Sequence, residues 1–437
     1  MIRRLAWEIL RSGQAIPTRG VSALAARHEL SERDRGLLRH LVGCEVRRRG
    51  TLVAVVSHLA HGRIHADLAA HLRLGLVQLL FADQVPDHAA VSETVGAVHD
   101  TLGPAKSRTA NAILRAAVKL RSEGRSGDPR RDLVGRDLSL AAPVFRDPLR
   151  HPLLWAQDAL SMPAAFMKPW TRRFGEEGAR ELARSFLEEP PLSVRRTRPD
   201  LAPLPAELDG AVAGAHPAVF VLPARATGAV LASEAFRRGE LTVQGEAALR
   251  AAELCQAREG EAWLDLCAAP GGKTAVLAAA GARVTACDVS AAKIERGRES
   301  VERLGVGERV EWLLLEGGAP GPVEPHDGVL VDAPCSNSAV LGARPDARWR
   351  HGPAARAELA RLQADLLAAA AERTAVGGRM VYSTCSIEPE ENEQRVRAFC
   401  ASHPDWELEA ELATHPRPLS AGGPVDGGFA ARLCRNS

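Results

Sequence analysis

The stretch that decides the fold covers residues 261–290 and reads EAWLDLCAAPGGKTAVLAAAGARVTACDVS. An apolar run at 262–267 leads into the turn Ala268-Ala269-Pro270-Gly271-Gly272-Lys273. An alanine-rich run with helical character follows, and a second apolar run at 283–287 ends at Asp288. This order predicts a strand, a glycine turn, a helix, a second strand and an acid.

The turn has the features of a nucleotide-type cofactor site. Two glycines let the backbone approach a ligand, a following helix presents unpaired N–H groups, and an acid about 20 residues farther on suits a ribose diol. A Walker loop would require glycine where Cys267 stands, and G-x-G-x-x-G is absent. The site therefore suits an adenosine cofactor without a polyphosphate, such as S-adenosylmethionine. The alternative is a glycine turn in an ordinary α/β core.

Length and composition limit the classes of protein to which this chain can belong. A chain of 437 residues can form two or three domains, and the absence of an apolar run of 18 residues predicts no membrane span and a cytoplasmic location. Eight cysteines show no CxxC pair and no metal-ligand spacing, so we expect no metal and no disulfide framework. The thiols are then free for chemistry.

Positive charge is concentrated in the N-terminal third of the chain. Residues 1–150 contain 24 Lys and Arg against 15 Asp and Glu, whereas the whole chain has a net charge of only +2. An arginine-rich segment suits contacts with phosphates, so we expect it to bind nucleic acid. A helical dimerisation or lid domain is the alternative.

The periodicity divides the chain into three parts. Residues 1–125 are predicted to be all helical, with a capping-box-like start at Ser31-Glu32-Arg33-Asp34 for a helix through Leu41. Gly, Arg, Asp and Pro dominate 121–148, which predicts a linker. Residues 145–235 read as a small α+β connector, and 236–437 as an α/β domain.

Polar residues follow the strands predicted in this last part. Continuous apolar runs at 310–315, 328–331 and 379–382 indicate a buried, mostly parallel sheet whose site lies at the carboxyl ends of its strands. Two of these ends carry cysteine, in Asp332-Ala333-Pro334-Cys335 and Ser383-Thr384-Cys385. Either cysteine alone is more typical of a small buried residue, but two at neighbouring strand ends favour chemistry.

A methyl donor beside two cysteines points to cytosine C5 as the acceptor. This carbon is a poor nucleophile until a thiolate adds at C6, and an acid hydrogen-bonded to ring N3 favours the addition. Asp332, three residues before Cys335, is placed for that role. The residues alone leave open which cysteine attacks.

Four blocks in order carry a resemblance to a known family: LDLCAAPGGKT from Leu264, VDAPCSNSAV from Val331, GGRMVYSTCSIEPEENE from Gly377 and DGGFAARL from Asp426. They resemble the RNA cytosine-C5 methyltransferases of the NOL1/NOP2/Sun family. The blocks SERDRGLLRHLVGCEVRR, VPDHAAVSETV and NAILR resemble the NusB-like helical extension of the bacterial 16S ribosomal RNA members. The resemblance implies a NusB-like domain, a connector and a Rossmann-like methyltransferase domain.

The resemblance also implies roles for single residues. Cys385 becomes the nucleophile and Cys335 the group that helps to release product, while Asp332 lies between cofactor and base. The residues implied to bind S-adenosylmethionine are Cys267, Ala268, Ala269, Pro270, Gly271, Gly272, Lys273, Asp288, Glu316 and Asp332.

This sequence departs from the family pattern at several positions. Glu316-Gly317-Gly318 stands where Gly-Asp is usual, so that either Glu316 takes the place of the adenine-side acid or this contact is lost. Asn337-Ser338-Ala339 lacks a glycine before the valine, and Lys293 replaces arginine. The implied partner is small-subunit ribosomal RNA, bound by a monomer. A transfer RNA methyltransferase and a degenerate ribosome assembly factor are the alternatives.

Overall fold

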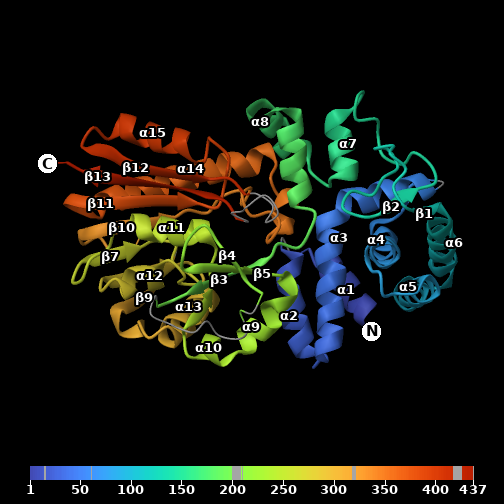
Figure 1. Cartoon of the computed structure of the whole chain (residues 1–437), viewed down its shortest axis with the longest axis horizontal. Coiled ribbons are helices and arrows are strands. Elements are labelled where there is room, and N and C mark those ends of the chain that lie inside the picture. The colour runs from blue at the N-terminus through green and yellow to red at the C-terminus, as the bar shows by residue number, and fades with distance from the viewer. Residues whose placement is uncertain are drawn as a thin grey trace. The chain divides into compact units, whose positions relative to one another are not determined.

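The computed structural model describes residues 1–13, 16–60, 62–198, 208, 210–316, 321–416 and 426–436 (Figure 1). The chain forms two compact units. The first comprises Met1–Glu188 and Leu341–Arg350, and the second comprises Glu189–Val340 and His351–Ser437. The boundary after Glu188 falls inside the region 145–235, and the division of the chain into three domains stays a prediction.

The first unit begins with the predicted helices. These are α1 (Ile2–Arg11), α2 (Pro17–Arg27), α3 (Glu32–Leu59), α4 (Ala66–Phe81), α5 (Asp87–Leu102) and α6 (Pro104–Leu120). The Ser31 hydroxyl accepts the Asp34 N–H at 3.1 Å and so caps α3, which continues well beyond the predicted end at Leu41. The prediction of helices is confirmed as far as Leu120, whereas Arg121–Glu123, which also lie within the predicted boundary at 125, form a strand. No helix in the described part of the chain is long and apolar enough to cross a membrane.

The rest of the first unit has more structure than its composition predicts. Strands β1 (Arg121–Glu123) and β2 (Leu138–Leu140) pair antiparallel, and α7 (Pro152–Ala159) and α8 (Ala164–Ser185) follow. The prediction of a linker over 121–148 is therefore wrong. Scattered apolar side chains with no periodicity, among them Leu133, Leu140 and Phe145, are buried there and hold the segment against the unit.

The second unit contains a small antiparallel sheet. Its strands are β3 (Leu192–Arg196), β4 (Val212–Ala213), β5 (Val219–Leu222) and β6 (Leu241–Val243), in the order β4-β5-β3-β6. Helices α9 (Thr227–Ala232) and α10 (Glu234–Arg237) share its core, where Val194, Val230 and Leu241 are buried.

A seven-stranded sheet dominates the second unit. Its strands are β7 (Ala262–Asp265), β8 (Arg283–Asp288), β9 (Val310–Leu314), β10 (His326–Asp332), β11 (Thr374–Thr384), β12 (Trp406–Thr414) and β13 (Gly428–Arg435). They lie in the order β12-β13-β11-β10-β7-β8-β9. Strand β13 is antiparallel to both of its neighbours, β12 and β11, and the five strands β11, β10, β7, β8 and β9 are parallel to one another. The predicted mostly parallel sheet is confirmed.

Helices cover both faces of this sheet, which explains its continuous apolar strands (Figure 1). On one face α14 (Pro353–Glu372) and α15 (Glu393–Ser402) pack on side chains such as Val331 and Tyr382. On the other, α11 (Glu246–Leu254) and α12 (Thr274–Ala279) pack on the alternate residues, such as Leu330 and Val381. Helix α13 (Ala291–Arg303) lies against Trp312 of β9. The architecture is Rossmann-like.

Candidate active site

The glycine turn lies between β7 and α12, as predicted. The Ala268 N–H donates to the Cys287 carbonyl at 2.9 Å, which ties the turn to β8. Gly271 has φ +87°, and a Cβ atom there would lie 3.2 Å from the Trp312 ring. Both the left-handed conformation and the close approach require glycine. The turn thereby presents backbone rather than side chains at the carboxyl edge of the sheet.

Asp288 ends β8 beside this turn and is buried. Its carboxylate accepts the Ser290 N–H at 2.9 Å and forms an ion pair with Lys293 at 3.4 Å. These contacts leave acceptor capacity for a diol. Glu316 lies two residues beyond β9 and its side chain is exposed. The change at Gly317 and Gly318 lies outside the described residues.

Lys273 and Asp332 form the central ion pair of the site. Lys273 Nζ lies 2.6 Å from Asp332 Oδ2, and the Ser383 hydroxyl donates to Asp332 Oδ1 at 2.9 Å. Burial lowers the pKa of Lys273, but the charge of Asp332 and the hydrogen bond with it outweigh this effect, so that the pKa of Lys273 is raised. Lys273, in the turn that follows β7, is therefore a cation held against the carboxylate of Asp332 at the end of β10.

The two cysteines lie together at the ends of β10 and β11. In the parallel register of these strands Asp332 pairs with Ser383, so the turns that follow lie side by side. Cys335 Sγ and Cys385 Sγ are 3.2 Å apart. The Cys385 thiol and burial raise the pKa of the Cys335 thiol well above its usual range. Cys335 therefore stays protonated, whereas Cys385 is the less buried of the two.

Asn337 is a third group at the sulfur pair, which the sequence shows only as a departure from the family pattern. Its φ of +58° is left-handed, a conformation that asparagine tolerates. Asn337 Nδ2 donates to the Cys335 carbonyl at 2.8 Å, and the Cys385 thiol donates to Asn337 Oδ1 at 3.3 Å. The carboxamide thus orients both cysteine turns.

Buried Glu391 stabilises the turn that contains Cys335 through hydrogen bonds to Ser336. Its carboxylate accepts the Ser336 hydroxyl at 2.6 Å and the Ser336 N–H at 3.0 Å. Gln363 of α14 donates to the Pro334 carbonyl at 3.0 Å, and the Tyr382 hydroxyl donates to the Glu391 carbonyl at 2.7 Å. Glu391 belongs to a quoted motif, but nothing local in the sequence shows that it supports a turn some fifty residues earlier.

Asp265, at the end of β7, is the buried acid beneath the cofactor turn. Its Oδ2 accepts the Thr274 hydroxyl at 2.8 Å, and burial raises the pKa of Asp265 to about 7. The burial of Cys267 likewise raises the pKa of its thiol. Sequence reasoning assigned no role to Asp265, because its burial depends on the strands on either side of it.

We expect Asp265 to make the stability of the protein depend on pH. An unfolded aspartic acid has a pKa near 4, so between about pH 4 and 7 the folded state binds the extra proton and its stability falls as the pH rises. The decrease amounts to at most about 4 kcal/mol. Denaturant unfolding of the wild type and Asp265→Asn from pH 4 to 8 measures it. Parallel pH profiles for the two proteins would show that Asp265 does not titrate in this range.

The described residues contain no group of three or more His, Cys, Asp or Glu side chains that could hold a metal ion. The side chains at the strand ends are instead thiols, a carboxylate, an ammonium group and a carboxamide. Such a set can form a covalent bond through sulfur and can move protons.

Two family models match the chain in separate regions. The 16S rRNA methyltransferase RsmB/F model matches residues 252–424, and the NusB family model matches residues 3–119. The first match contains Lys273, Asp288, Asp332 and both cysteines of the sulfur pair.

Curated relatives match over nearly their whole length. A probable ribosomal RNA small subunit methyltransferase B from Synechocystis sp. is 31% identical and covers 95% of this chain and 92% of its own. The ribosomal RNA small subunit methyltransferase B of Pseudomonas putida is 32% identical, with 93% and 92% covered.

Solved structures share the fold. The crystal structure of PH0851 covers 99% of this chain and 98% of its own, with a TM-score of 0.76 and 22% identity. The crystal structure of NSun6 from Pyrococcus horikoshii with SFG covers 63% and 98%, with a TM-score of 0.54 and 18% identity. Because the sequence relatives exceed 30% identity across almost the entire chain, this protein belongs to the family of the ribosomal RNA small subunit methyltransferase B proteins.

Proposed function

We propose that this methyltransferase forms 5-methylcytidine in 16S ribosomal RNA, with Cys385 as the nucleophile. The observation that carries the proposal is the pair of sulfurs, 3.2 Å apart, that follow the ends of β10 and β11, together with the ion pair between Asp332 at the end of β10 and Lys273 of the cofactor turn. Methylation of nitrogen or oxygen needs no thiol. Two thiols next to an acid suit a carbon acceptor that must first be activated.

S-Adenosylmethionine is the methyl donor of this enzyme and supplies the methyl group when it is bound. The residues that would hold it are the turn from Cys267 to Lys273, with Asp288, Glu316 and Asp332. The fit rests on the backbone exposed by glycine at 271 and on the buried carboxylate of Asp288. An anionic acceptor at a strand end suits ribose hydroxyls.

The proposed reaction passes through a covalent bond between the Cys385 sulfur and C6 of cytosine. The Cys385 thiol first loses its proton to solvent, and the thiolate adds to C6 of cytosine. The Lys273–Asp332 pair hydrogen-bonds at ring N3 and stabilises the charge that develops there. The C5 carbon, now an enamine carbon, takes the methyl group. A base then removes the C5 proton, the C6–S bond breaks and the thiolate leaves. Cys335, held protonated, assists this elimination.

The overall proposal is tested on the RNA. Bisulfite sequencing of ribosomal RNA compares cells with and without this protein. We expect one small-subunit cytosine to be protected only when the protein is present. Protection of a cytosine in transfer RNA instead would show that the substrate is transfer RNA. Absence of any protein-dependent site would favour an assembly factor without activity.

Asp288→Asn is expected to weaken cofactor binding. The variant turns charged hydrogen bonds worth about 1.5–3 kcal/mol into neutral ones worth about 0.5–1.5 kcal/mol, so the dissociation constant of S-adenosylmethionine should rise about five- to tenfold. Isothermal titration calorimetry measures this constant. Glu308→Gln, which changes an exposed carboxylate of the same unit, is the matched control. Equal affinities of the wild type and Asp288→Asn would exclude Asp288 from the site.

The remaining assignments belong to the same proposal. We assign RNA binding to a NusB-like domain at 1–125, a connecting role to 145–235 and catalysis to 236–437. The NusB family match at 3–119 and the positive charge of the first 150 residues support the first assignment. We further propose that the protein acts in the cytoplasm, where this substrate is found, and that it does so as a monomer.

A further inference from the structure

A cavity of about 690 Å³ lies in the first unit, outside both family matches. Its wall consists of the segment 125–137, Trp155 of α7 and Arg184 of α8. Cavities of about 300–1,000 Å³ are typical of small-molecule and cofactor sites. The cavity is therefore large enough for a nucleotide, and the predicted linker supplies most of its lining.

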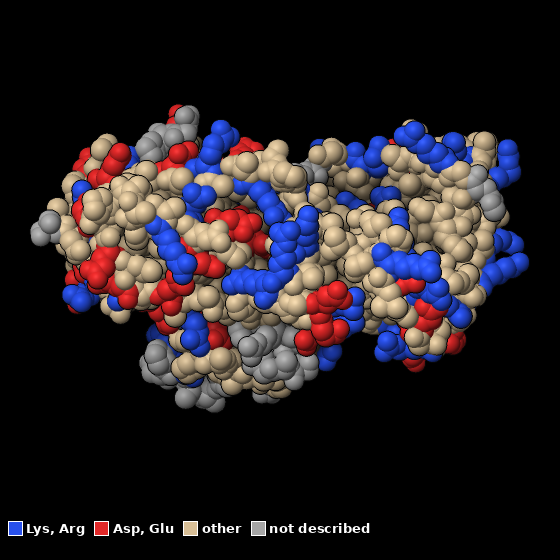
Figure 2. Space-filling view, turned by 90° about the horizontal axis from the view of Figure 1, so that it is seen from above, with Lys and Arg blue, Asp and Glu red and all other residues tan. Residues whose placement is uncertain are grey.

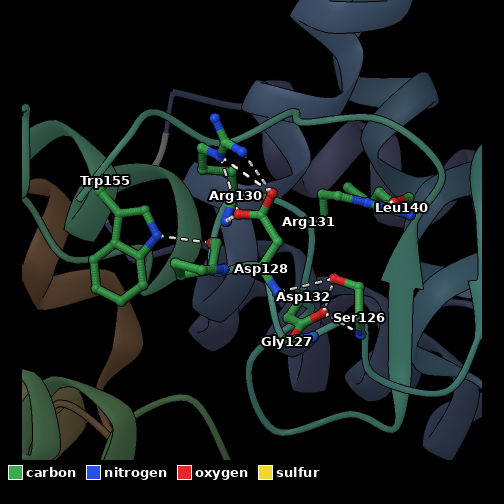
Figure 3. Close-up of polar contacts among 9 residues, drawn as sticks. Ser126, Gly127, Asp128, Arg130, Arg131, Asp132, Leu140 and Trp155 are labelled. Carbon is green, nitrogen blue, oxygen red and sulfur yellow. Dashed lines mark hydrogen bonds and ion pairs between the residues drawn. The ribbon is translucent and has the colours of Figure 1, made fainter. Parts of the chain in front are cut away.

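Asp132 gives the segment its shape. Its carboxylate accepts the Ser126 N–H at 2.7 Å, the Ser126 hydroxyl at 2.6 Å and the Gly127 N–H at 3.1 Å (Figure 3). Burial by itself would raise the pKa of Asp132, but these donors outweigh burial and lower it. Asp132 is therefore an ionised acid whose oxygens are already occupied by its own loop. It organises the rim, and Arg125 lies 3.7 Å from it as a counter-ion.

Trp155 forms a rigid apolar wall. Its indole N–H donates to the Pro129 carbonyl at 2.9 Å, and the Arg180 guanidinium lies 5.5 Å from its ring centre. Figure 3 labels Trp155 and marks the hydrogen bond of its indole with a dashed line. The side chain is almost fully buried, so these contacts fix it in one orientation. A fixed aromatic edge beside cations is a common element of nucleotide-binding sites.

Five charged residues line the cavity, and cations are in excess among them: Arg125, Arg136 and Arg184 against Asp132 and Asp137. Figure 2 shows Lys and Arg side chains at several places on the part of the view that contains the first unit. Arg125 and Arg184 have 72% and 44% of their side chains exposed. Arg184 pairs with the exposed Glu177 at 3.0 Å, and Arg136 pairs with the exposed Asp83. Because an exposed pair such as Arg184–Glu177 is weak, a phosphate can replace its carboxylate at little cost, and guanidinium groups bind phosphate oxygens in pairs.

We infer that this cavity binds one nucleotide of single-stranded RNA, with its phosphate among Arg125, Arg136 and Arg184. The inference rests on the proposed RNA substrate. A concave site admits a nucleotide that is unstacked and turned outward, which single-stranded loops and bulges provide and a regular duplex does not. The cavity is separate from the cofactor site and holds the RNA chain at a second point.

The double variant Arg125→Gln/Arg184→Gln tests the inference. The matched control, Arg361→Gln/Arg397→Gln, removes two exposed arginines from α14 and α15 of the second unit. Binding of a short single-stranded fragment of 16S ribosomal RNA is measured across a salt series. We expect the cavity variant to bind about ten- to a hundredfold more weakly, with a salt slope smaller by about 0.7 for each phosphate that the protein no longer neutralises. The control should change affinity less than about threefold.

Two further measurements separate the outcomes. At saturating RNA the cavity variant should still transfer methyl groups, so a weaker affinity alone supports the inference. Failure of the wild type to methylate any RNA would contradict the proposed function instead. An RNA affinity and salt slope equal to those of the wild type would overturn the inference. So would a defect seen only with a mononucleotide or inorganic phosphate, which would assign the cavity to a free metabolite. Unchanged thermal unfolding shows that the variants fold.

Discussion

Cys385→Ala should abolish methyl transfer, with a fall of about 10,000-fold or more, because the variant has no sulfur that can add to C6 of cytosine. It should also form no covalent complex with RNA. Cys335→Ala should behave differently, since it retains the attacking sulfur and lacks only the group assigned to the elimination. That variant should methylate once and then stall as an RNA–protein complex that survives denaturing electrophoresis.

The double variant Cys335→Ala/Cys385→Ala is the control for this experiment. Because the complex requires the Cys385 sulfur, it should disappear in the double variant. The 3.2 Å separation of the sulfurs makes exchange of their roles sterically easy, so the reverse result is a real alternative. A trapped complex with Cys385→Ala and none with Cys335→Ala would make Cys335 the nucleophile. Both outcomes are read from the same gel.

Arg348→Met should destabilise the first unit by about 3–5 kcal/mol, because it leaves three carbonyl groups without a donor at a cost of about 1–3 kcal/mol each. Arg348 is 1% exposed and donates to the carbonyls of Phe186 at 3.0 Å, of Leu341 at 3.2 Å and of Arg47 at 3.2 Å. Burial, followed by the charges of Arg47 and Arg48, lowers the pKa of Arg348 to about 9, which leaves it charged at pH 7. Methionine fills the volume but leaves these carbonyls without a donor.

Regional hydrogen exchange measures this destabilisation, since it reports each unit separately. Amides of α3 and α8 should exchange about a hundred- to a thousandfold faster in Arg348→Met, while β10 and β11 in the second unit keep their protection. Arg39→Met, an exposed arginine of α3, is the control and should leave exchange unchanged. Unaltered protection in Arg348→Met would mean that the carbonyls find other donors.

Local pattern was sufficient for the elements that carry the site. Because a buried strand is a continuous apolar run and a parallel sheet has its site at the carboxyl ends, Asp288, Asp332 and Cys385 could be placed at strand ends from the sequence. The linker prediction failed for a related reason. Residues 121–148 bury side chains without a period of 2 or 3.6, and only a periodic pattern reveals burial.

The sequence by itself determined the fold class, the cofactor turn and the two cysteines, because each of these depends on residues close together in the chain. Tertiary structure alone decided which groups meet. The register between β10 and β11 brings Cys335 to Cys385, and the Lys273 side chain reaches Asp332. Packing of the first unit likewise buries Arg348 and closes the cavity beside Trp155. Register and packing depend on all neighbouring elements at once, so no single stretch of sequence contains that information.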